Sequence, residues 1–130
     1  MTADASSTPH FDNRITQLLG VEVPIANSPM GFVVKPDLVA AVANAGGIGL
    51  VPGSIGIAGA QEDIKRTRDL TDRPVGVNLP IAFVRDASIA DMLVDEGIPF
   101  VTTSAGSPMA FTPVLKQAGM KVLQIGRAHV

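Results

Sequence analysis

Small, uncharged polar residues gather at four points where an apolar run of the sequence stops. These points are residues 27–31, 52–54, 78–80 and 104–108. Together they supply hydroxyl groups, amides, glycines and prolines, and none of them carries a charged side chain. Hard cations prefer carboxylate oxygens, so this chemistry does not favour a cation site. It favours a neutral ligand, polar or flat, that is held mainly by backbone groups.

Asn78 is the most informative side chain of this set, because an amide at the end of an apolar strand has two donor hydrogens and an acceptor to satisfy. Two interpretations stay open: Asn78 contacts a ligand, or it caps the following loop. Ser104 and Ser107 also have two interpretations, and capping a helix is the commoner role for a serine in front of one. The sequence shows no Ser-His-Asp or metal-binding arrangement and no candidate acid or base at these strand ends, so the catalytic residues stay unassigned.

The four points belong to a repeat of strand, small-residue turn, helix and glycine. The strands are continuous apolar runs rather than alternating ones, which is typical of a parallel sheet that helices cover. Strands are predicted over residues 21–26, 48–51, 75–79, 100–103 and 121–124. Helices are predicted over residues 38–45, 59–70, 87–96 and 111–118, after a short helical turn within residues 11–20. In the helix over residues 59–70, the side chains expected to face the core are Ala60, Ile64 and Leu70.

Strand starts separated by 20-odd residues indicate an α/β fold of parallel βα repeats. Two architectures fit this pattern, an open doubly wound sheet and a (β/α)8 barrel. In both, a ligand binds at the carboxyl ends of the strands. A complete barrel usually needs about 250 residues, and this chain has 130.

The composition narrows the range of partners. The net charge is -2, aromatic residues make up 4%, and tryptophan and tyrosine are absent, so we expect no nucleic-acid partner. The absence of cysteine excludes disulfides and thiolate metal sites. No apolar stretch reaches the roughly 20 residues that span a bilayer, and no secretory signal is recognisable. We therefore expect a cytoplasmic protein with no membrane partner.

Five blocks of the sequence follow one another in a familiar order: RITQLLG at residues 14–20, PIANSPMG at 24–31, LVAAVANAGGIG at 38–49, LTDRPVGVNL at 70–79 and VTTSAGSP at 101–108. Together they resemble the opening of the nitronate monooxygenase family, of the 2-nitropropane dioxygenase type. FMN-dependent enoyl-acyl-carrier-protein reductases are similar over the same segments. The resemblance implies a TIM barrel that binds FMN without a covalent bond, with residues 14–124 as its N-terminal half.

The resemblance also implies roles for particular residues. Pro29, Met30 and Gly31 are expected to contact the flavin through their backbone, and Asn78 to hydrogen-bond the cofactor with Pro80 beside it. The implied reaction is oxidation of a nitronate, a small-molecule substrate, followed by reoxidation of the flavin by molecular oxygen. The alternative is the enoyl reductase activity, with a reduced nicotinamide as electron donor. The residues expected on the substrate side are Ser104, Ala105 and Gly106.

The two ends of the chain depart from this pattern. Residues 1–13 are predicted to be a disordered tail, because they are polar and small. Residues 125–130, IGRAHV, equal the translation of a common sequencing adapter, ATCGGAAGAGCACACGTC, and we interpret them as a non-native tail. The chain is then a fragment, expected to be a non-catalytic half-barrel, because the family's catalytic histidine and phosphate-binding glycine turns lie in the second half. Its open sheet edges are expected to favour self-association.

Overall fold

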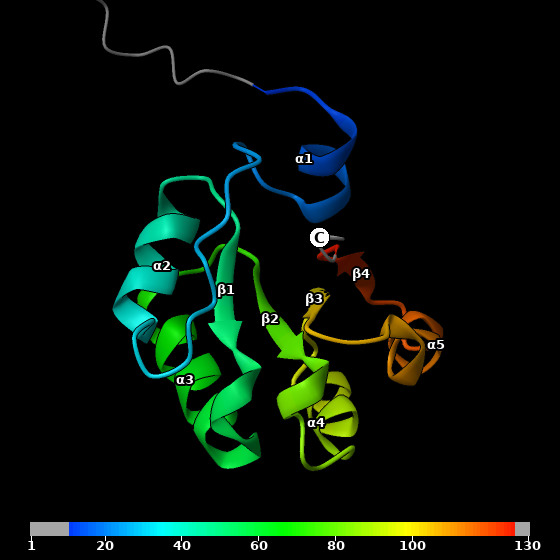
Figure 1. The fold of residues 1–130 in the computed structure, drawn as a ribbon. Coiled ribbons are helices and arrows are strands. Elements are labelled where there is room, and N and C mark those ends of the chain that lie inside the picture. The colour runs from blue at the N-terminus through cyan, green and yellow to red at the C-terminus, as the bar shows by residue number, and fades with distance from the viewer. Residues whose placement is uncertain (1–10, 127–130) are drawn as a thin grey trace, which may run out of the picture.

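Helices and strands alternate along residues 11–126, which are the residues that the computed structural model describes (Figure 1). In chain order, the helices α1 to α5, the strands β1 to β4 and the short 3-10 helices η1 to η3 are α1 (Arg14–Leu19), α2 (Pro36–Asn44), β1 (Gly49–Pro52), η1 (Gly53–Ile55), α3 (Ile57–Leu70), β2 (Val75–Pro80), η2 (Ile81–Phe83), α4 (Ile89–Asp95), β3 (Phe100–Ser104), η3 (Pro108–Ala110), α5 (Thr112–Gln117) and β4 (Lys121–Gln124). The predicted βα repeat is confirmed, with boundaries that differ by about two residues for most elements.

The four strands form one sheet in the order β1-β2-β3-β4, and every pair is parallel. Pro52 pairs with Asn78, Pro80 with Ser104, and Thr103 with Gln124. These pairs lie within the last three residues of their strands, so the carboxyl ends of all four strands meet at one rim of the sheet. The loops that follow this rim carry the polar turns that the sequence singles out.

The two faces of the sheet bury different clusters, because successive side chains of a strand point to opposite sides. Val51, Val77 and Val101 belong to the larger cluster, which also contains side chains of helices α2 to α5. Leu50 and Phe100 belong to a smaller cluster with Leu19 of α1 and Ile48. We call the face that carries Leu50 and Phe100 the inner face. Because both faces of the sheet are buried along β1 to β3, the sequences of these strands are continuous apolar runs.

The first predicted strand, over residues 21–26, is wrong as a buried strand. The structure contains only an isolated parallel bridge between Ala26 and Ile48 there. Pro24 has no backbone N–H to donate, and the side chain of Ile25 is 66% exposed. Within residues 11–126, no strand covers the other side of this segment, so its apolar character reflects an uncovered edge rather than a core strand.

The prediction for the buried stripe of α3 is also wrong at one position. Ala60 and Ile64 are buried, but Leu70 is 48% exposed. Thr67 is buried instead, and its hydroxyl donates to the Asp63 carbonyl oxygen at 2.7 Å. The spacing of four and then three residues keeps Ala60, Ile64 and Thr67 on one face, whereas Leu70 is the last residue of the helix and turns away from it.

The predictions for the two ends of the chain fall mainly on residues that the structure does not describe. Residues 1–10 of the predicted tail and residues 127–130 of the predicted non-native segment lie outside the described part. Asn13 caps α1, since its side-chain oxygen accepts from the backbone N–H groups of Ile15 and Thr16.

None of the helices between residues 11 and 126 combines the length and the apolar character that crossing a bilayer requires.

Gly76 of β2 packs directly against Phe100 of the inner cluster. A Cβ atom at this position would lie 2.2 Å from Cε2 of Phe100 and 2.7 Å from its carbonyl oxygen. The Phe100 ring therefore occupies the space that a side chain at Gly76 would need, near the amino ends of β2 and β3.

The substitution Gly76→Ala tests this packing. We expect it to lower the free energy of unfolding by about 1–3 kcal/mol, because the ring and backbone of Phe100 must both move to admit a methyl group. Urea unfolding followed by circular dichroism measures the change. Gly126→Ala is the control, since no atom lies within 4 Å of a Cβ there, and equal midpoints for the two variants would contradict the packing described.

Candidate functional site

Asn78 lies near the carboxyl end of β2 on the inner face and is 3% exposed. The hydroxyl of Thr102 donates to Asn78 Oδ1 at 2.8 Å, and Ser104 Oγ lies 3.4 Å from both Oδ1 and Nδ2 of the same amide. Within the described residues, Asn78 makes no side-chain hydrogen bond to the loop that follows it. The amide is therefore held across the sheet by β3 and does not cap the loop.

The segments after β2 and β3 lie against each other. The backbone N–H of Ala82 donates to the Ala105 carbonyl oxygen at 3.0 Å. A Cβ atom on Gly106 would lie 2.8 Å from Cβ of Ile81, so only glycine allows this approach. Pro80, Ser104, Ala105 and Gly106, all predicted at the site, are thus brought together beside Asn78. The sequence offers no sign of the left-handed backbone of Ala105, whose φ is 51°.

Ser107 takes the commoner of its two predicted roles. Its hydroxyl oxygen accepts from the backbone N–H of Met109 at 3.4 Å and so caps η3. Ser104 instead belongs to the hydrogen-bonded group around Asn78. The two serines of one loop therefore serve different purposes.

The segment 29–31 lies on the other side of the rim, beside the end of β1. A Cβ atom on Gly31 would lie 2.5 Å from Ser54 Oγ, so the absence of a side chain lets this turn pack against η1. Met30 is 52% exposed, and its backbone N–H donates to the Ser28 carbonyl oxygen at 2.9 Å. The predicted flavin-contacting residues thus form two groups, one beside β1 and one beside β2 and β3.

Asn27 fixes the start of the 28–31 turn, and its individual role is not predicted by the sequence. Its Oδ1 accepts from the backbone N–H of Leu50 at 2.7 Å, and its Nδ2 donates to the Leu50 carbonyl oxygen at 3.0 Å. The side chain thereby replaces a strand residue at the edge of β1. The backbone of the chain is released from pairing and turns out over the rim. An amide directly after an apolar run was the only available signal.

A cavity of about 410 Å3 lies on the inner face between the 26–29 segment and β4. Apolar side chains form most of its wall, and no lining residue carries a titratable group. Of the residues predicted at the site, only Pro29 lines it. The lining residues are Leu19, Ala26, Asn27, Ser28, Pro29, Ile48, Leu50, Phe100, Thr102, Leu123, Gln124 and Ile125.

Three of the polar side chains around this cavity, those of Thr102, Asn27 and Gln124, are already paired within the protein. Thr102 donates to Asn78, and both ends of the Asn27 amide bind Leu50. Gln124 accepts from the Thr103 hydroxyl and donates to the Ile125 carbonyl oxygen. Among residues 11–126, the backbone N–H groups of Ser28 and Gly31 donate to no recorded partner. A ligand at this rim would therefore meet backbone groups and an apolar floor.

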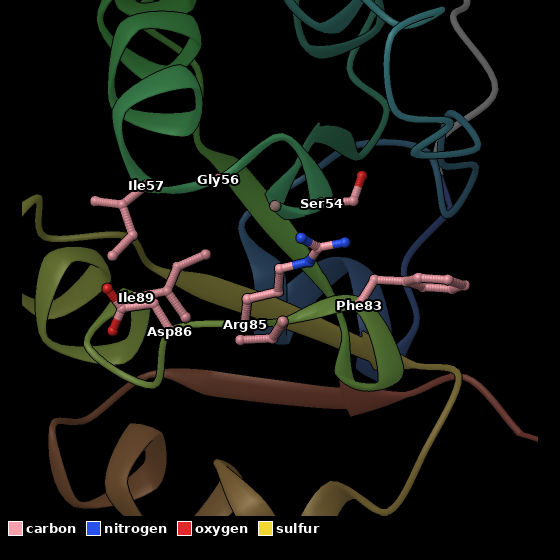
Figure 2. Close-up of a pocket in the computed structure, with 9 residues that line it drawn as sticks. Ser54, Gly56, Ile57, Phe83, Arg85, Asp86 and Ile89 are labelled. Carbon is pink, nitrogen blue, oxygen red and sulfur yellow. The ribbon is translucent and has the colours of Figure 1, made fainter.

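A second cavity, of about 120 Å3, lies between η1 and the segment after β2. Figure 2 shows the Arg85 side chain extending toward Ser54, and the Phe83 ring pointing away from the cavity. Within the described residues, Arg85 has no carboxylate within ion-pair distance. No group of three or more metal-binding side chains occurs between residues 11 and 126.

Asp86 is the titratable group at this second cavity whose pKa is shifted. The Ser88 hydroxyl donates to Asp86 Oδ1 at 2.7 Å and the Ser88 backbone N–H donates to the same oxygen at 2.9 Å. These two hydrogen bonds, the hydroxyl first, hold the pKa of Asp86 below its usual range. Because the folded pKa is lowered, the stabilisation is present above the pKa of the unfolded chain and is lost as the pH falls through the folded value.

Substituting Asn27→Ala should destabilise the fold and free the 28–31 turn. We expect a loss of about 1–3 kcal/mol in the free energy of unfolding, because the buried backbone groups of Leu50 lose both partners. Faster hydrogen exchange at the Leu50 amide, measured by NMR, would accompany the loss. Ser28→Ala is the control, and a Leu50 amide that exchanges as slowly in Asn27→Ala as in the wild type would contradict this role.

Replacing Ser88→Ala should raise the pKa of Asp86 toward the ordinary value of about 3.9. The backbone donor remains, so part of the lowering is expected to persist. Carbon-detected NMR titration of the Asp86 carboxyl between about pH 6 and pH 2 measures the change. Ser107→Ala should leave this titration unmoved, and an unchanged pKa in Ser88→Ala would show that the hydroxyl does not cause the shift.

Known proteins match this chain over most of its length. The family model for nitronate monooxygenase matches residues 12–118. Nitronate monooxygenase from Pseudomonas aeruginosa is 46% identical over 72 residues, which cover 52% of this chain and 19% of that protein. A protein from Rhodococcus jostii named (3aS,4S,5R,7aS)-5-hydroxy-7a-methyl-1-oxo-octahydro-1H-indene-4-carboxyl-CoA dehydrogenase is 36% identical over 120 residues, covering 88% of this chain and 33% of that protein.

Solved structures agree with these sequence matches. FabK from Thermotoga maritima, a TIM-barrel protein, superposes with a TM-score of 0.79 at 34% identity, over 85% of this chain and 36% of that one. The present chain therefore spans about a third of the length of these relatives, and its open parallel sheet corresponds to part of their barrel. Since the family model covers most of the described residues, the chain belongs to the nitronate monooxygenase family, a family of oxidoreductases.

Proposed function

We propose that this chain is part of an FMN-dependent oxidoreductase that oxidises nitronates with molecular oxygen, and that it binds the ring system of the FMN. The inner-face cavity is the observation that carries this proposal. Its walls are apolar or carry uncharged polar groups, and it extends from Leu19 and Phe100, near the amino ends of the strands, to Ser28 and Pro29 at the carboxyl rim, where α/β barrels place their active sites. Bound there, FMN would supply the redox chemistry, taking electrons from the nitronate and passing them to oxygen.

The chemistry of the cavity suits the flavin ring, which is flat and apolar with a polar edge. Leu50, Phe100 and Leu123 offer an apolar floor. The backbone N–H groups of Ser28, in the cavity wall, and of Gly31, beside it, are available as donors. Of the three residues proposed for backbone contacts, Gly31 is the one with an available N–H, since Pro29 has none and the Met30 N–H is bonded to Ser28. On the other side, Asn78 would donate to the ring beside Pro80. The residues proposed for the substrate side remain Ser104, Ala105 and Gly106.

The FMN phosphate does not suit this cavity. Phosphate groups bind arginine or lysine, or a helix N-terminus with free backbone N–H groups. No lysine or arginine lines the cavity of about 410 Å3. We propose that the phosphate is held by a part of the enzyme beyond residues 14–124, since the relatives are about three times as long. The isolated chain would then be an inactive part of the enzyme.

A second candidate is chemistry on a thioester-linked substrate. FabK superposes over 85% of the chain, and the R. jostii dehydrogenase, whose name specifies a carboxyl-CoA substrate, matches 88% of it. The carboxyl-CoA substrate in the name of the R. jostii protein is the basis for keeping the enoyl reductase alternative, whose substrate is also an acyl thioester. Oxidation of a reduced nicotinamide by the full-length enzyme, without a nitronate, would favour this candidate.

The open edges of the sheet support a proposal about association. Lys121 and Gln124 of the edge strand β4 are exposed, and the opposite edge ends in a single bridge at Ala26. Edges of this kind pair with further strands. We propose that the isolated chain self-associates through them.

The purified chain should bind FMN only weakly, with a Kd in the millimolar range, about -4 kcal/mol. The ring would find its apolar floor, but the phosphate would find no partner, so a large excess of inorganic phosphate should not displace it. NMR titration of the 15N-labelled chain with FMN, in the absence and in the presence of inorganic phosphate, measures the Kd and the displacement. Stoichiometric binding at micromolar FMN, or displacement by phosphate, would contradict the assignment of the ring and phosphate to different parts of the enzyme.

A further inference from the structure

The edge of the sheet beside β1 carries backbone groups that have no partner. The Ile48 N–H donates to the Ile25 carbonyl oxygen at 2.8 Å, and the Asn27 N–H donates to the Ile48 carbonyl oxygen at 3.3 Å. Ala26 lies between these two bonds, so its own N–H and carbonyl groups point away from β1. Within residues 11–126, neither group of Ala26 has a recorded partner.

The opposite edge of the sheet, strand β4, presents groups of the same kind (Figure 1). The backbone N–H groups of Lys121 and Ile125 donate toward β3 at 3.1 and 2.8 Å. Backbone groups of successive strand residues point alternately to the two sides. The N–H and carbonyl groups of Val122 and Gln124 therefore point away from β3, toward a position where the sheet has no further strand.

Ala26 of one copy fits opposite Leu123 of a second copy. In this register the Ala26 N–H faces the Val122 carbonyl oxygen, and the Ala26 carbonyl oxygen faces the Gln124 N–H. Residues at the same level of neighbouring parallel strands point to the same face. Ala26 and Leu123 both line the inner-face cavity, so this register keeps both side chains on the inner face.

The side chains of the two edges favour the same contact. Glu22 and Lys121 are the only charged residues among positions 22–27 and 121–124, and they have opposite signs at the amino ends of the two segments. Glu22 pairs with Arg73 at 2.7 Å and its side chain is still 44% exposed. Ile25, which is 66% exposed, would lie beside Val122, a residue packed against the larger apolar cluster.

We propose that two copies of this chain associate about a two-fold axis that runs along the strands, with β4 of each copy paired in parallel with residues 24–27 of the other. The inference rests on the proposed self-association and specifies its partner, its stoichiometry and its contacts. A two-fold axis in this direction forms both junctions at once and keeps all strands parallel.

The shape and chemistry of the inner face agree with this arrangement. The chain superposes on the TIM-barrel protein FabK with a TM-score of 0.79, so its sheet has the curvature of part of a barrel and can close with a second curved sheet. The two inner faces then enclose one core, and no titratable side chain lines the cavity that they cover. The carboxyl rims of both copies lie at the same end of the dimer.

Two variants test the junction. Ala26→Pro removes an N–H group that has no recorded partner within the described chain. Each dimer would lose two hydrogen bonds, so the dimer Kd should rise about tenfold or more. Ala26→Ser keeps the N–H and is the matched control. Ile25→Asp is a second variant in case Ala26→Pro does not give a folded spectrum, and Leu70→Asp on α3 is its control, since Leu70 is 48% exposed and lies away from both edges.

Sedimentation equilibrium of the chain without FMN, from micromolar to millimolar concentration, measures the association. We expect a single equilibrium between monomer and dimer, weakened by Ala26→Pro and Ile25→Asp and unchanged by Ala26→Ser and Leu70→Asp. In a mixture of 15N-labelled and 13C-labelled copies, nuclear Overhauser effects should connect the Ala26 amide of one copy with β4 of the other.

The contrary results separate the claims. A chain that stays monomeric at millimolar concentration would overturn the proposed self-association and this inference together. Ever larger species that Ala26→Pro weakens would support association through the edges and overturn the closed dimer alone. A dimer that Leu70→Asp weakens, but Ala26→Pro and Ile25→Asp do not, would place the contact on another surface and overturn the inference. Because FMN is absent, none of these results depends on flavin binding.

Discussion

The parallel pairing of four strands is the constraint on which the rest of the structure depends. Once Pro52 pairs with Asn78, Pro80 with Ser104 and Thr103 with Gln124, the ends of all four strands meet at one rim. The strand pairing alone therefore makes neighbours of residues that are far apart in the sequence. The hydrogen bond between Thr102 and Asn78 follows directly from this register.

The two faces of the sheet differ, because one is a continuous apolar core and the other borders a cavity. The helix-facing side is a continuous apolar core that includes Val51, Val77 and Val101. The inner face is closed at its amino end by Leu19 and Phe100 and opens into a cavity toward the rim. Local hydrogen bonds hold the loops at the rim, for example those between the Asn27 amide and the backbone of Leu50 at the edge of β1. A rigid rim of this kind can hold a flat ligand by backbone contacts.

Strand positions were predictable because strands buried on both faces are continuous apolar runs, as in residues 75–79. The same reasoning failed for residues 21–26, since an apolar run does not reveal whether a neighbouring strand covers it. The amide of Asn27 looked like one more polar turn residue, because its partner Leu50 lies 23 positions away. The turn residues of the site were located at the rim, but the pairing of Asn78 with Thr102 depends on strand register, which periodicity alone does not supply.

The family assignment and the geometry of the cavity are the basis for proposing that a flavin ring binds in the inner-face cavity. The most direct measurement is the pattern of intermolecular nuclear Overhauser effects between the aromatic and methyl protons of FMN and the protons of the labelled chain. The account predicts contacts with Pro29, Met30 and Thr102, around the cavity of about 410 Å3. Contacts confined to the smaller cavity beside Arg85 and Asp86, or scattered over the outer helices, would contradict it.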